Sequence, residues 1–476
     1  MKPGNHLLRV TVLTLVAACA ANAQTDDATR RLSYDIFKQL IEINTTDSVG
    51  NITKASDAMA KRLIDAGFSP DDVKILGPSE RKKNLVVRLR GTGAQKPILF
   101  IGHLDVVEAP REEWSTDPFQ LTEKDGYFYG RGTDDMKSED AVLVTTFIRL
   151  KQENYKPSRD LILALTADEE GGKSNGVDWL LKNHRELVDA EFVINPDGGG
   201  VDLRKGKPLL MSMDATEKLY ADYQVEATNP GGHSSLPRPD NSIYELANAL
   251  ARLEHYQFPF ELNSVTRAFF ERTAAIETGE SSADMRAILA DPPDPAAIAR
   301  LSQDPYFNST MRTTCVATRL DAGLANNALP QAAYANVNCR ILPGHSREQV
   351  RQDLVRILGD QKIAVRYVDT NGKVHDQAPD AVALPPVPLR TDVMKPLEEA
   401  AHEVWPGIPV IPTMATGASD GVYTNAVGIP TYSVSGMALE MGDDRAHARD
   451  ERVPVKSYYG DLDFYYRFVK KLAPET

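Results

Sequence analysis

Side chains that could bind a cation occur in five short segments that lie far apart along the chain. The segments are FIGHLDVV with His103 and Asp105, GRGTDDMK with Asp134 and Asp135, LTADEEGG with Glu169 and Glu170, VINPDGGG with Asp197, and AHARDERV with His447. Adjacent carboxylates repel one another, so either water solvates them on an exposed loop or a cation is shared between them. Imidazole and carboxylate together form a ligand set that suits Zn²⁺.

Taken singly, each segment has an ordinary explanation. A Glu-Glu pair is most often a solvated face, and PDGGG alone is a turn. Asp134 and Asp135 could occupy the first turn of a helix, where the helix dipole favours acidic residues. An isolated histidine such as His447 is most often a surface residue or one whose hydrogen bonds are satisfied. These explanations account poorly for the occurrence of all five segments in one chain.

The elements that must position these residues alternate between strands and helices. KPILFIGH, DLILALTA and AEFVINP have the apolar runs of buried strands, whereas SDAMAKRLIDAGF and EDAVLVTTFIRLKQ have helical spacing. Such alternation predicts a three-layer α/β domain with a mostly parallel sheet. Four of the five segments follow the ends of predicted strands, which is where open α/β sheets place their active sites.

The sequence pattern of the predicted strands changes near residue 215. Apolar and polar residues alternate from there on, instead of forming unbroken apolar runs. LYADYQVEAT, TTCVATRL, AAYANVNCRILP and KIAVRYVDT read as half-exposed strands, and NSIYELANALARL between two of them reads as a helix. The stretch from ETGESS to DPPDPAA reads as an excursion within this second domain, and the proline-rich 378–390 as the linker back. We therefore expect an inserted, smaller α+β lid or dimerisation domain. The expected division is a signal peptide at 1–23, a catalytic domain at 31–213 and 385–476, and the insertion at 214–377.

Size and composition are those of a globular, enzyme-sized protein. At 476 residues two domains are expected, and 42% hydrophobic with 25% charged residues argues against wholesale disorder. The net charge of −13, without a basic cluster, argues against a nucleic-acid partner.

The N-terminus reads as a secretory signal peptide. Lys2 and Arg9 precede an apolar run, and the small residues ANA precede Gln24. We therefore expect export, most plausibly to a periplasm. VAAC, ending at Cys19, also resembles a lipoprotein processing site, which would anchor the protein by a lipid. No later segment approaches 18 unbroken apolar residues, so no transmembrane segment and a soluble mature protein are expected.

Two further cysteines, Cys315 and Cys339, lie in strand-like runs. They could pair, although two buried free cysteines are the commoner arrangement.

The whole ordered set of motifs resembles the M20 family of dinuclear zinc peptidases, which includes dipeptidases, carboxypeptidases and aminoacylases. The motifs are GHLDVV, GRGTDDMK, TADEEGG, NPDGG, NPGGHSS, NALP with NCRILP, and AHARDERV. They run from about residue 31 to the C-terminus. This resemblance implies a dinuclear site in which His103 binds one metal, His447 the other, and Asp135 bridges them. Glu170 and Asp197 would complete the two sites, with two Zn²⁺ per subunit and Mn²⁺ or Co²⁺ possible.

The resemblance also implies roles for residues beside these ligands. Glu169 would be the general base, since neighbouring residues of an extended segment point to opposite faces and Glu170 can then bind metal. Asp105 would orient His103 and fix its tautomer. Asp134 is not expected to be a ligand.

Four residues would bind substrate by the same resemblance. His233 would donate to the carbonyl oxygen, either in its own site or across a homodimer formed through the inserted domain. Arg340 would hold the substrate carboxylate, for which a guanidinium is suited, and Asn327 and Gly417 would belong to substrate-binding loops. The alternatives are a glycine-rich turn at His233 and a plain surface arginine at Arg340.

The chain departs from the family pattern at a few positions. Ser138 replaces a common glycine and Asp450 a common asparagine, and neither change removes a ligand. Asp197 rather than glutamate weakly favours dipeptidase-like members. We therefore expect an exported two-zinc enzyme that cleaves dipeptides or small peptides. An N-acyl amino acid amidase is the alternative; a binding protein of the same fold without catalysis is disfavoured because all ligands and Glu169 are present.

Overall fold

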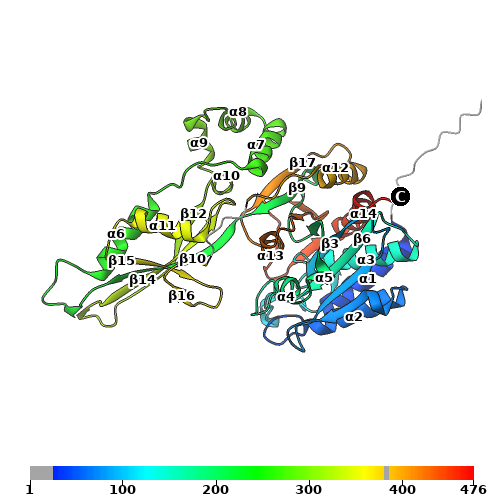
Figure 1. Cartoon of the computed structure of the whole chain (residues 1–476), viewed down its shortest axis with the longest axis horizontal. Coiled ribbons are helices and arrows are strands. Elements are labelled where there is room, and N and C mark those ends of the chain that lie inside the picture. The colour runs from blue at the N-terminus through cyan, green and yellow to red at the C-terminus, as the bar shows by residue number, and fades with distance from the viewer. Residues whose placement is uncertain (1–24, 380–384, 476) are drawn as a thin grey trace, which may run out of the picture.

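The computed structural model describes residues 25–379 and 385–475, which form two sheets side by side (Figure 1). The larger sheet has ten strands and forms one part of the molecule together with the helices that cover it. The smaller sheet has five strands and lies beside that part. The predicted signal peptide and Cys19 lie outside the described residues. None of the helices in the described part of the chain is long and apolar enough to cross a membrane.

The larger sheet is mixed, with a parallel centre. Its order is β1 (Val73–Leu76), β2 (Asn84–Leu89), β6 (Arg159–Thr166), β3 (Gln95–His103), β7 (Phe192–Asn195), β18 (Thr431–Ser433), β9 (Lys207–Glu217), β8 (Gly200–Arg204) and β19 (Ala438–Glu440), with β17 (Val410–Ala415) on β9. The four strands β6, β3, β7 and β18 run parallel to one another. The predicted α/β class with a mostly parallel central sheet is confirmed.

Helices cover both faces of the larger sheet. One face packs against α1 (Asp27–Glu42), α2 (Ile52–Asp65), α3 (Lys137–Gln152), α12 (Thr391–Val404) and α14 (Val455–Leu472). The other packs against α4 (Gly176–Asn183), α5 (Arg185–Val188) and α13 (Gly421–Ala426). In β3, Ile98 and Phe100 join the first core while Leu99 and Ile101 join the second, since successive side chains of a strand point to opposite faces. Burial on both faces explains why these strands are apolar without alternation.

The smaller sheet is entirely antiparallel and has its own core. Its order is β12 (Thr314–Ala322), β14 (Ala332–Ile341), β10 (Leu219–Thr228), β15 (Ile363–Val368) and β16 (Val374–His375). Helices α6 (Ser242–Glu254) and α11 (Arg347–Leu358) contribute to the core with one face of the strands. Burial alternates along the whole of β14, as expected for a sheet with one covered face.

Two short sheets complete the strand inventory. One comprises β4 (Thr122–Lys124), β5 (Tyr127–Tyr129) and β20 (Arg452–Pro454), and the other β11 (Gly232–His233) and β13 (Ala328–Leu329). The short 3₁₀ helices are η1 (Pro70–Asp72) and η2 (Arg111–Glu113).

Strand β12 is an open edge of the smaller sheet, held to β14 by a disulfide. Cys315 and Cys339 are directly opposite in the β12–β14 register and form a disulfide, with 4.1 Å between their Cα atoms. The sequence left the pairing open, and the structure shows the paired alternative. The sequence placed both residues in strands but could not show that these strands are neighbours.

The helical stretch before β12 packs against the larger sheet. It comprises α7 (Ser264–Ile276), α8 (Gly279–Ile288), α9 (Pro295–Leu301) and α10 (Pro305–Thr310). These helices form one apolar cluster with Ile411 of β17, and Leu210 of β9 packs against it. The excursion expected within the second domain therefore returns to the larger sheet, which the view down the shortest axis also shows (Figure 1).

One junction between the two sheets is a single residue. Lys218 alone separates β9 of the larger sheet from β10 of the smaller sheet. Its side chain is fully buried, and Nζ donates to the carbonyl oxygen of Arg312 at 2.8 Å and to Thr314 Oγ1 at 3.5 Å. Arg312 and Thr314 belong to another passage of the chain, which leads into β12.

Candidate metal centre

The carboxyl ends of three adjacent parallel strands bring the predicted residues together. His103 is the last residue of β3, Glu169 and Glu170 follow β6, and Asp197 follows β7. Because β6, β3 and β7 are parallel neighbours, their carboxyl ends lie at one edge of the larger sheet. Asp135 precedes α3, whose buried length passes beneath the same strands.

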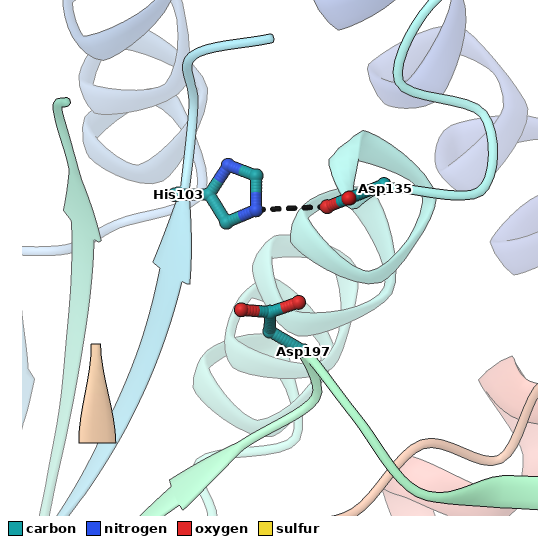
Figure 2. Close-up of side chains that lie close together, drawn as sticks. All are labelled: His103, Asp135 and Asp197. Atoms are coloured by element: carbon teal, nitrogen blue, oxygen red, sulfur yellow. Dashed lines mark hydrogen bonds and ion pairs between the residues drawn. The ribbon is translucent and has the colours of Figure 1, made fainter. Parts of the chain in front are cut away.

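The first group of possible metal ligands is His103, Asp135 and Asp197. His103 Nε2 is 2.9 Å from Asp135 Oδ1, and one donor atom of each of the three residues lies within 4.8 Å of the others. Figure 2 shows the three side chains converging from β3, from the start of α3 and from the loop after β7. His103 is only 2% exposed.

The second group is Asp135, Glu170 and His447. His447 Nε2 is 3.0 Å from Asp135 Oδ2 and 2.8 Å from the Glu170 carboxylate. The two oxygens of Asp135 therefore face different imidazoles, and this carboxylate is common to both groups. The side chain of His447 is half-exposed, so the second group opens toward solvent.

The tautomer of His103 is fixed by Asp105, through the backbone. His103 Nδ1 donates to the carbonyl oxygen of Asp105 at 3.0 Å, so Nε2, which faces Asp135, is the ring nitrogen that could bind a metal. The Asp105 carboxylate is 3.9 Å from that ring nitrogen and instead accepts from the backbone N–H groups of Glu169 and Glu170, at 3.1 and 2.9 Å. Asp105 thus holds the His103 ring with its carbonyl oxygen and the backbone of Glu169 and Glu170 with its carboxylate.

Glu451 holds the Asp135 turn and was not singled out by the sequence. Its Oε1 accepts from the backbone N–H groups of Asp134 and Asp135, at 2.7 and 3.1 Å, and its Oε2 pairs with Arg131 at 2.5 Å. The Asp134 carboxylate accepts from the Arg445 N–H, toward the loop that carries His447. Asp134 therefore has hydrogen-bond partners within the chain. Glu451 lies in the AHARDERV motif, and this position was the signal by which the sequence could have identified it.

Crowding of carboxylates shifts the pKa values of the site. Burial raises the pKa of Glu169 to about 9 and that of Asp197 to about 7. Hydrogen bonds that His447 donates to the Asp135 and Glu170 carboxylates raise its pKa to about 10. Although burial acts in the opposite direction, hydrogen bonds from the two histidines hold the pKa of Asp135 below its usual value. A set of buried carboxylates sharing two imidazoles has the chemistry of a cation site, because bound cations offset the repulsion.

A cavity of about 280 Å³ opens beside these residues. Glu169, Glu170, Asp197 and His447 line it, and so does Gly417 on the loop after β17. The predicted base and one predicted substrate-binding position therefore border the same space as the possible metal ligands.

Three predicted substrate-binding residues belong to the smaller sheet's side and do not line this cavity. His233 is exposed in β11, and its Nδ1 accepts from the Ser235 N–H at 3.1 Å. Asn327 precedes β13, the partner strand of β11. Arg340 in β14 lies over the Tyr220 ring, with Cζ 4.8 Å from the ring centroid. The structure thus assembles the histidine and carboxylate part of the site and leaves these three residues apart from it.

A mixed α/β fold that carries two adjoining histidine–carboxylate groups at the carboxyl edge of its sheet has a possible metal site. The family model "Peptidase family M20/M25/M40" matches residues 99–471. The chain belongs to this peptidase family, and it is a hydrolase of peptide or amide bonds.

Similar proteins come from several branches of the family. The chain is 28% identical over 396 residues to a probable carboxypeptidase S-like protein 2 of Dictyostelium discoideum, covering 79% of this chain and 71% of that protein. It is 26% identical over 383 residues to the human N-fatty-acyl-amino acid synthase/hydrolase PM20D1, covering 79% and 74%.

Solved structures of the same fold include peptidases. The M20 family metallo-carboxypeptidase Sso-CP2 from Sulfolobus solfataricus superposes with a TM-score of 0.67 at 19% identity, covering 94% of this chain and 99% of that one. Human carnosine dipeptidase 1 gives 0.61 at 14% identity, covering 94% and 97%. At these identities the likeness supports the fold alone.

Proposed function

We propose that the protein is a dinuclear zinc hydrolase that cleaves the amide bond of dipeptides or small peptides. The observation that carries the proposal is the position of Asp135, whose two carboxylate oxygens lie 2.9 and 3.0 Å from the imidazoles of His103 and His447. A carboxylate shared in this way fits a bridge between two cations. His103 and Asp197 would complete one site, and Glu170 with His447 the other.

The donor set fits divalent zinc. Nitrogen of neutral imidazole and oxygen of carboxylate are zinc ligands, and Asp105 already presents His103 in the required tautomer. Mn²⁺ and Co²⁺ accept the same donors. When bound, the metal pair would lower the pKa of a water molecule and polarise the substrate carbonyl.

Glu169 is the proposed general base and acid. Its carboxyl group lines the cavity beside the metal ligands, and burial raises its pKa to about 9. That pKa belongs to the metal-free protein; cations bound beside Glu169 would favour its ionised form, which could then accept the proton of the attacking water and pass it to the leaving nitrogen. Asp105 assists by holding the Glu169 and Glu170 backbone in place.

Within the insertion expected at 214–377, between catalytic segments 31–213 and 385–476, the smaller sheet is the proposed lid or dimerisation domain, whereas residues 214–217 and helices α7 to α10 pack with the larger sheet. In this assignment Arg340 holds the substrate carboxylate, and Asn327 and Gly417 belong to substrate-binding loops, of which that of Gly417 lines the cavity. The separate apolar core of the smaller sheet supports its independence from the larger sheet.

We also propose a homodimer formed through the smaller sheet. The open edge strand β12 exposes Val316 and Leu320, and Leu324 beyond it is 97% exposed. An unpaired strand edge with apolar side chains favours pairing with another chain. A second copy is then a source of His233, which does not reach the cavity of its own chain in this structure.

Export is supported by the Cys315–Cys339 disulfide, because structural disulfides persist in oxidising compartments. We propose a signal peptide at residues 1–23 and a periplasmic location, with lipid attachment at Cys19 as the alternative.

An N-acyl amino acid amidase remains the second candidate. The match to N-fatty-acyl-amino acid synthase/hydrolases across 79% of this chain favours it. Both reactions break an amide bond next to a carboxylate-bearing residue and need the same catalytic groups.

A substrate panel with metal analysis tests the proposal. Purified protein is reconstituted with Zn²⁺, Mn²⁺ or Co²⁺ and assayed on dipeptides and on N-acetyl and N-dodecanoyl amino acids of the same C-terminal residue. Two equivalents of metal and highest kcat/KM on dipeptides support the proposal. Preference for the dodecanoyl series supports the amidase, and absence of both bound metal and turnover supports a binding protein that has lost catalysis.

A further inference from the structure

The cavity at the metal centre continues away from the proposed ligands to a second acidic wall. Asp214 and Glu217 of β9 line it together with Ser419 of the loop after β17. Among the described residues, its lining includes neither lysine nor arginine. The far end of the cavity is thus acidic without a basic side chain to balance it.

Glu217 has one satisfied and one unsatisfied oxygen. Oε2 accepts from the backbone N–H of Ser419 at 2.8 Å and from its hydroxyl at 3.2 Å. Oε1 is buried and has no hydrogen-bond partner among residues 25–379 and 385–475. A Cβ at Gly421 would come within 2.9 Å of Oε1, so the Gly421 backbone packs close to this oxygen and only glycine fits there. An unsatisfied buried carboxylate oxygen is costly unless a donor reaches it.

Asp214 adds a second carboxylate to the same wall. Its Oδ2 accepts from the Gly199 N–H at 3.1 Å. Burial raises the pKa of Asp214, and burial together with the neighbouring Asp214 charge raises that of Glu217 to about 8. The two groups therefore favour a proton or a cation at this end of the cavity.

The proposed metals do not account for these two carboxylates. Two divalent cations carry four positive charges, which are matched by Asp135, Glu170, Asp197 and Glu169 around them. Asp214 and Glu217 are additional to this balance, and neither belongs to either group of possible metal ligands. They are neutralised either by a proton or by a cationic group that enters the cavity.

We propose that Glu217, assisted by Asp214, forms a subsite for a cationic amino or guanidino group on a substrate residue adjacent to the scissile amide bond. This inference rests on the proposed peptidase function and deepens it by naming the substrate class. An ammonium group supplies donors to Glu217 Oε1 and charge to both carboxylates, whereas a long acyl chain supplies neither. The subsite therefore selects basic peptides over N-fatty-acyl amino acids.

Glu217 also has a purely structural explanation, which the test must separate. By holding Ser419 it positions the loop that carries Gly417, so its loss could weaken every substrate alike. A specificity role predicts a selective effect on cationic substrates, and a loop-positioning role predicts a uniform one.

Lysine and norleucine provide matched substrates, because norleucine has the lysine chain length without the charge. The zinc-loaded full chain is assayed on Lys-Ala against Nle-Ala, Ala-Lys against Ala-Nle, and N-acetyl-lysine against N-acetyl-norleucine. We expect kcat/KM for lysine to exceed that for norleucine at least tenfold in one pair. Glu217→Gln should bring that ratio to within threefold of one while norleucine turnover stays within threefold of wild type, and Asp214→Asn should lower the ratio by a smaller factor.

Glu254→Gln, at the exposed end of α6, is the matched control and should leave the ratio unchanged. Equal cleavage of lysine and norleucine in every pair overturns the subsite and leaves the peptidase function intact. An equal loss on both substrates in Glu217→Gln assigns the residue to loop positioning and also overturns the subsite. If the wild-type protein loaded with metal cleaves no member of the panel, the proposed function itself fails.

Discussion

The larger and smaller sheets treat their chemically important side chains in opposite ways. Around the larger sheet, charged groups such as Glu451 and Lys137 are fully buried and bonded to groups of the same chain. On the smaller sheet's side, His233 is exposed, and Leu324 is 97% exposed. The first region holds the two groups of possible metal ligands, whereas the second presents exposed groups that do not line the cavity beside them.

Sheet architecture explains the difference. Parallel strands must be covered on both faces, so β7 is buried throughout and the loops at its end are held by a dense core. The antiparallel smaller sheet is covered on one face only, and its edge strand β12 is exposed for most of its length. Rigid parts position catalytic groups accurately, while an open edge and an exposed face are suited to contacts with substrate or another chain.

Glu169→Gln is the strongest test of the candidate metal centre at the larger sheet. Because the amide cannot accept the proton of water, kcat should fall by about 10³-fold. The metal ligands are untouched, so metal content measured by plasma emission should remain that of the wild type. Glu254→Gln serves as the control, and a Glu169→Gln enzyme with full turnover would disprove the assigned role.

His233→Ala tests whether the second region completes the first. Loss of a donor to the carbonyl oxygen should lower kcat by about 10²-fold, with unchanged circular dichroism and metal content.

Mixing the two variants locates the site that His233 serves. After subunit exchange, heterodimers of His233→Ala and Glu169→Gln contain one site with an intact base and an intact histidine, if the histidine acts across the dimer. Random exchange should then restore about a quarter of wild-type activity. If the mixture gains no activity although heterodimers are present, His233 acts within its own chain.

Leu320→Glu should weaken the proposed dimer. A charge on the open edge strand opposes pairing with a second copy, so the dimer dissociation constant from sedimentation should rise at least tenfold. Val49→Glu is a matched control because Val49 is 76% exposed but lies beside the larger sheet. Unchanged association of Leu320→Glu would remove β12 from the interface.

Metal affinity should rise with pH. A ligand must lose its proton to bind metal, and burial raises the pKa of Asp197 to about 7. Below pH 7 this carboxyl is increasingly protonated in the metal-free protein, so Zn²⁺ affinity should increase by about fivefold between pH 6 and 7 from this group alone. The proton on His447, whose pKa is raised to about 10, steepens the dependence. Competition with a chelating dye at the two pH values measures it, and a flat profile would contradict the assignment of Asp197.

The sequence predicts the larger sheet well because its information is local. Apolar runs mark β3 and β6, and the strand ends place His103 and Glu170 at one edge without knowledge of distant contacts. Contacts between distant segments were not predictable in the same way. Nothing in the pattern showed that Glu451 would accept the Asp135 N–H, or that Cys315 would lie opposite Cys339.

Side-chain patterns also leave backbone roles unseen. Asp105 was expected to orient His103, and it does, but with its carbonyl oxygen while its carboxylate serves Glu169. The sequence marked 277–297, within the stretch that forms α7 to α10, only as an excursion of the second domain, and it did not show the sheet on which these helices pack.

The one-residue junction at Lys218 links the movement of one sheet to the shape of the cavity in the other. Its ammonium ties the start of β10 to the chain entering β12, so these two passages must turn together. The preceding residue, Glu217, forms part of the acidic wall. If the smaller sheet moves toward a bound peptide, the movement is passed directly to Glu217, the carboxylate proposed to bind the cationic group of the substrate. Closure of the smaller sheet and selection of a basic substrate would then be coupled.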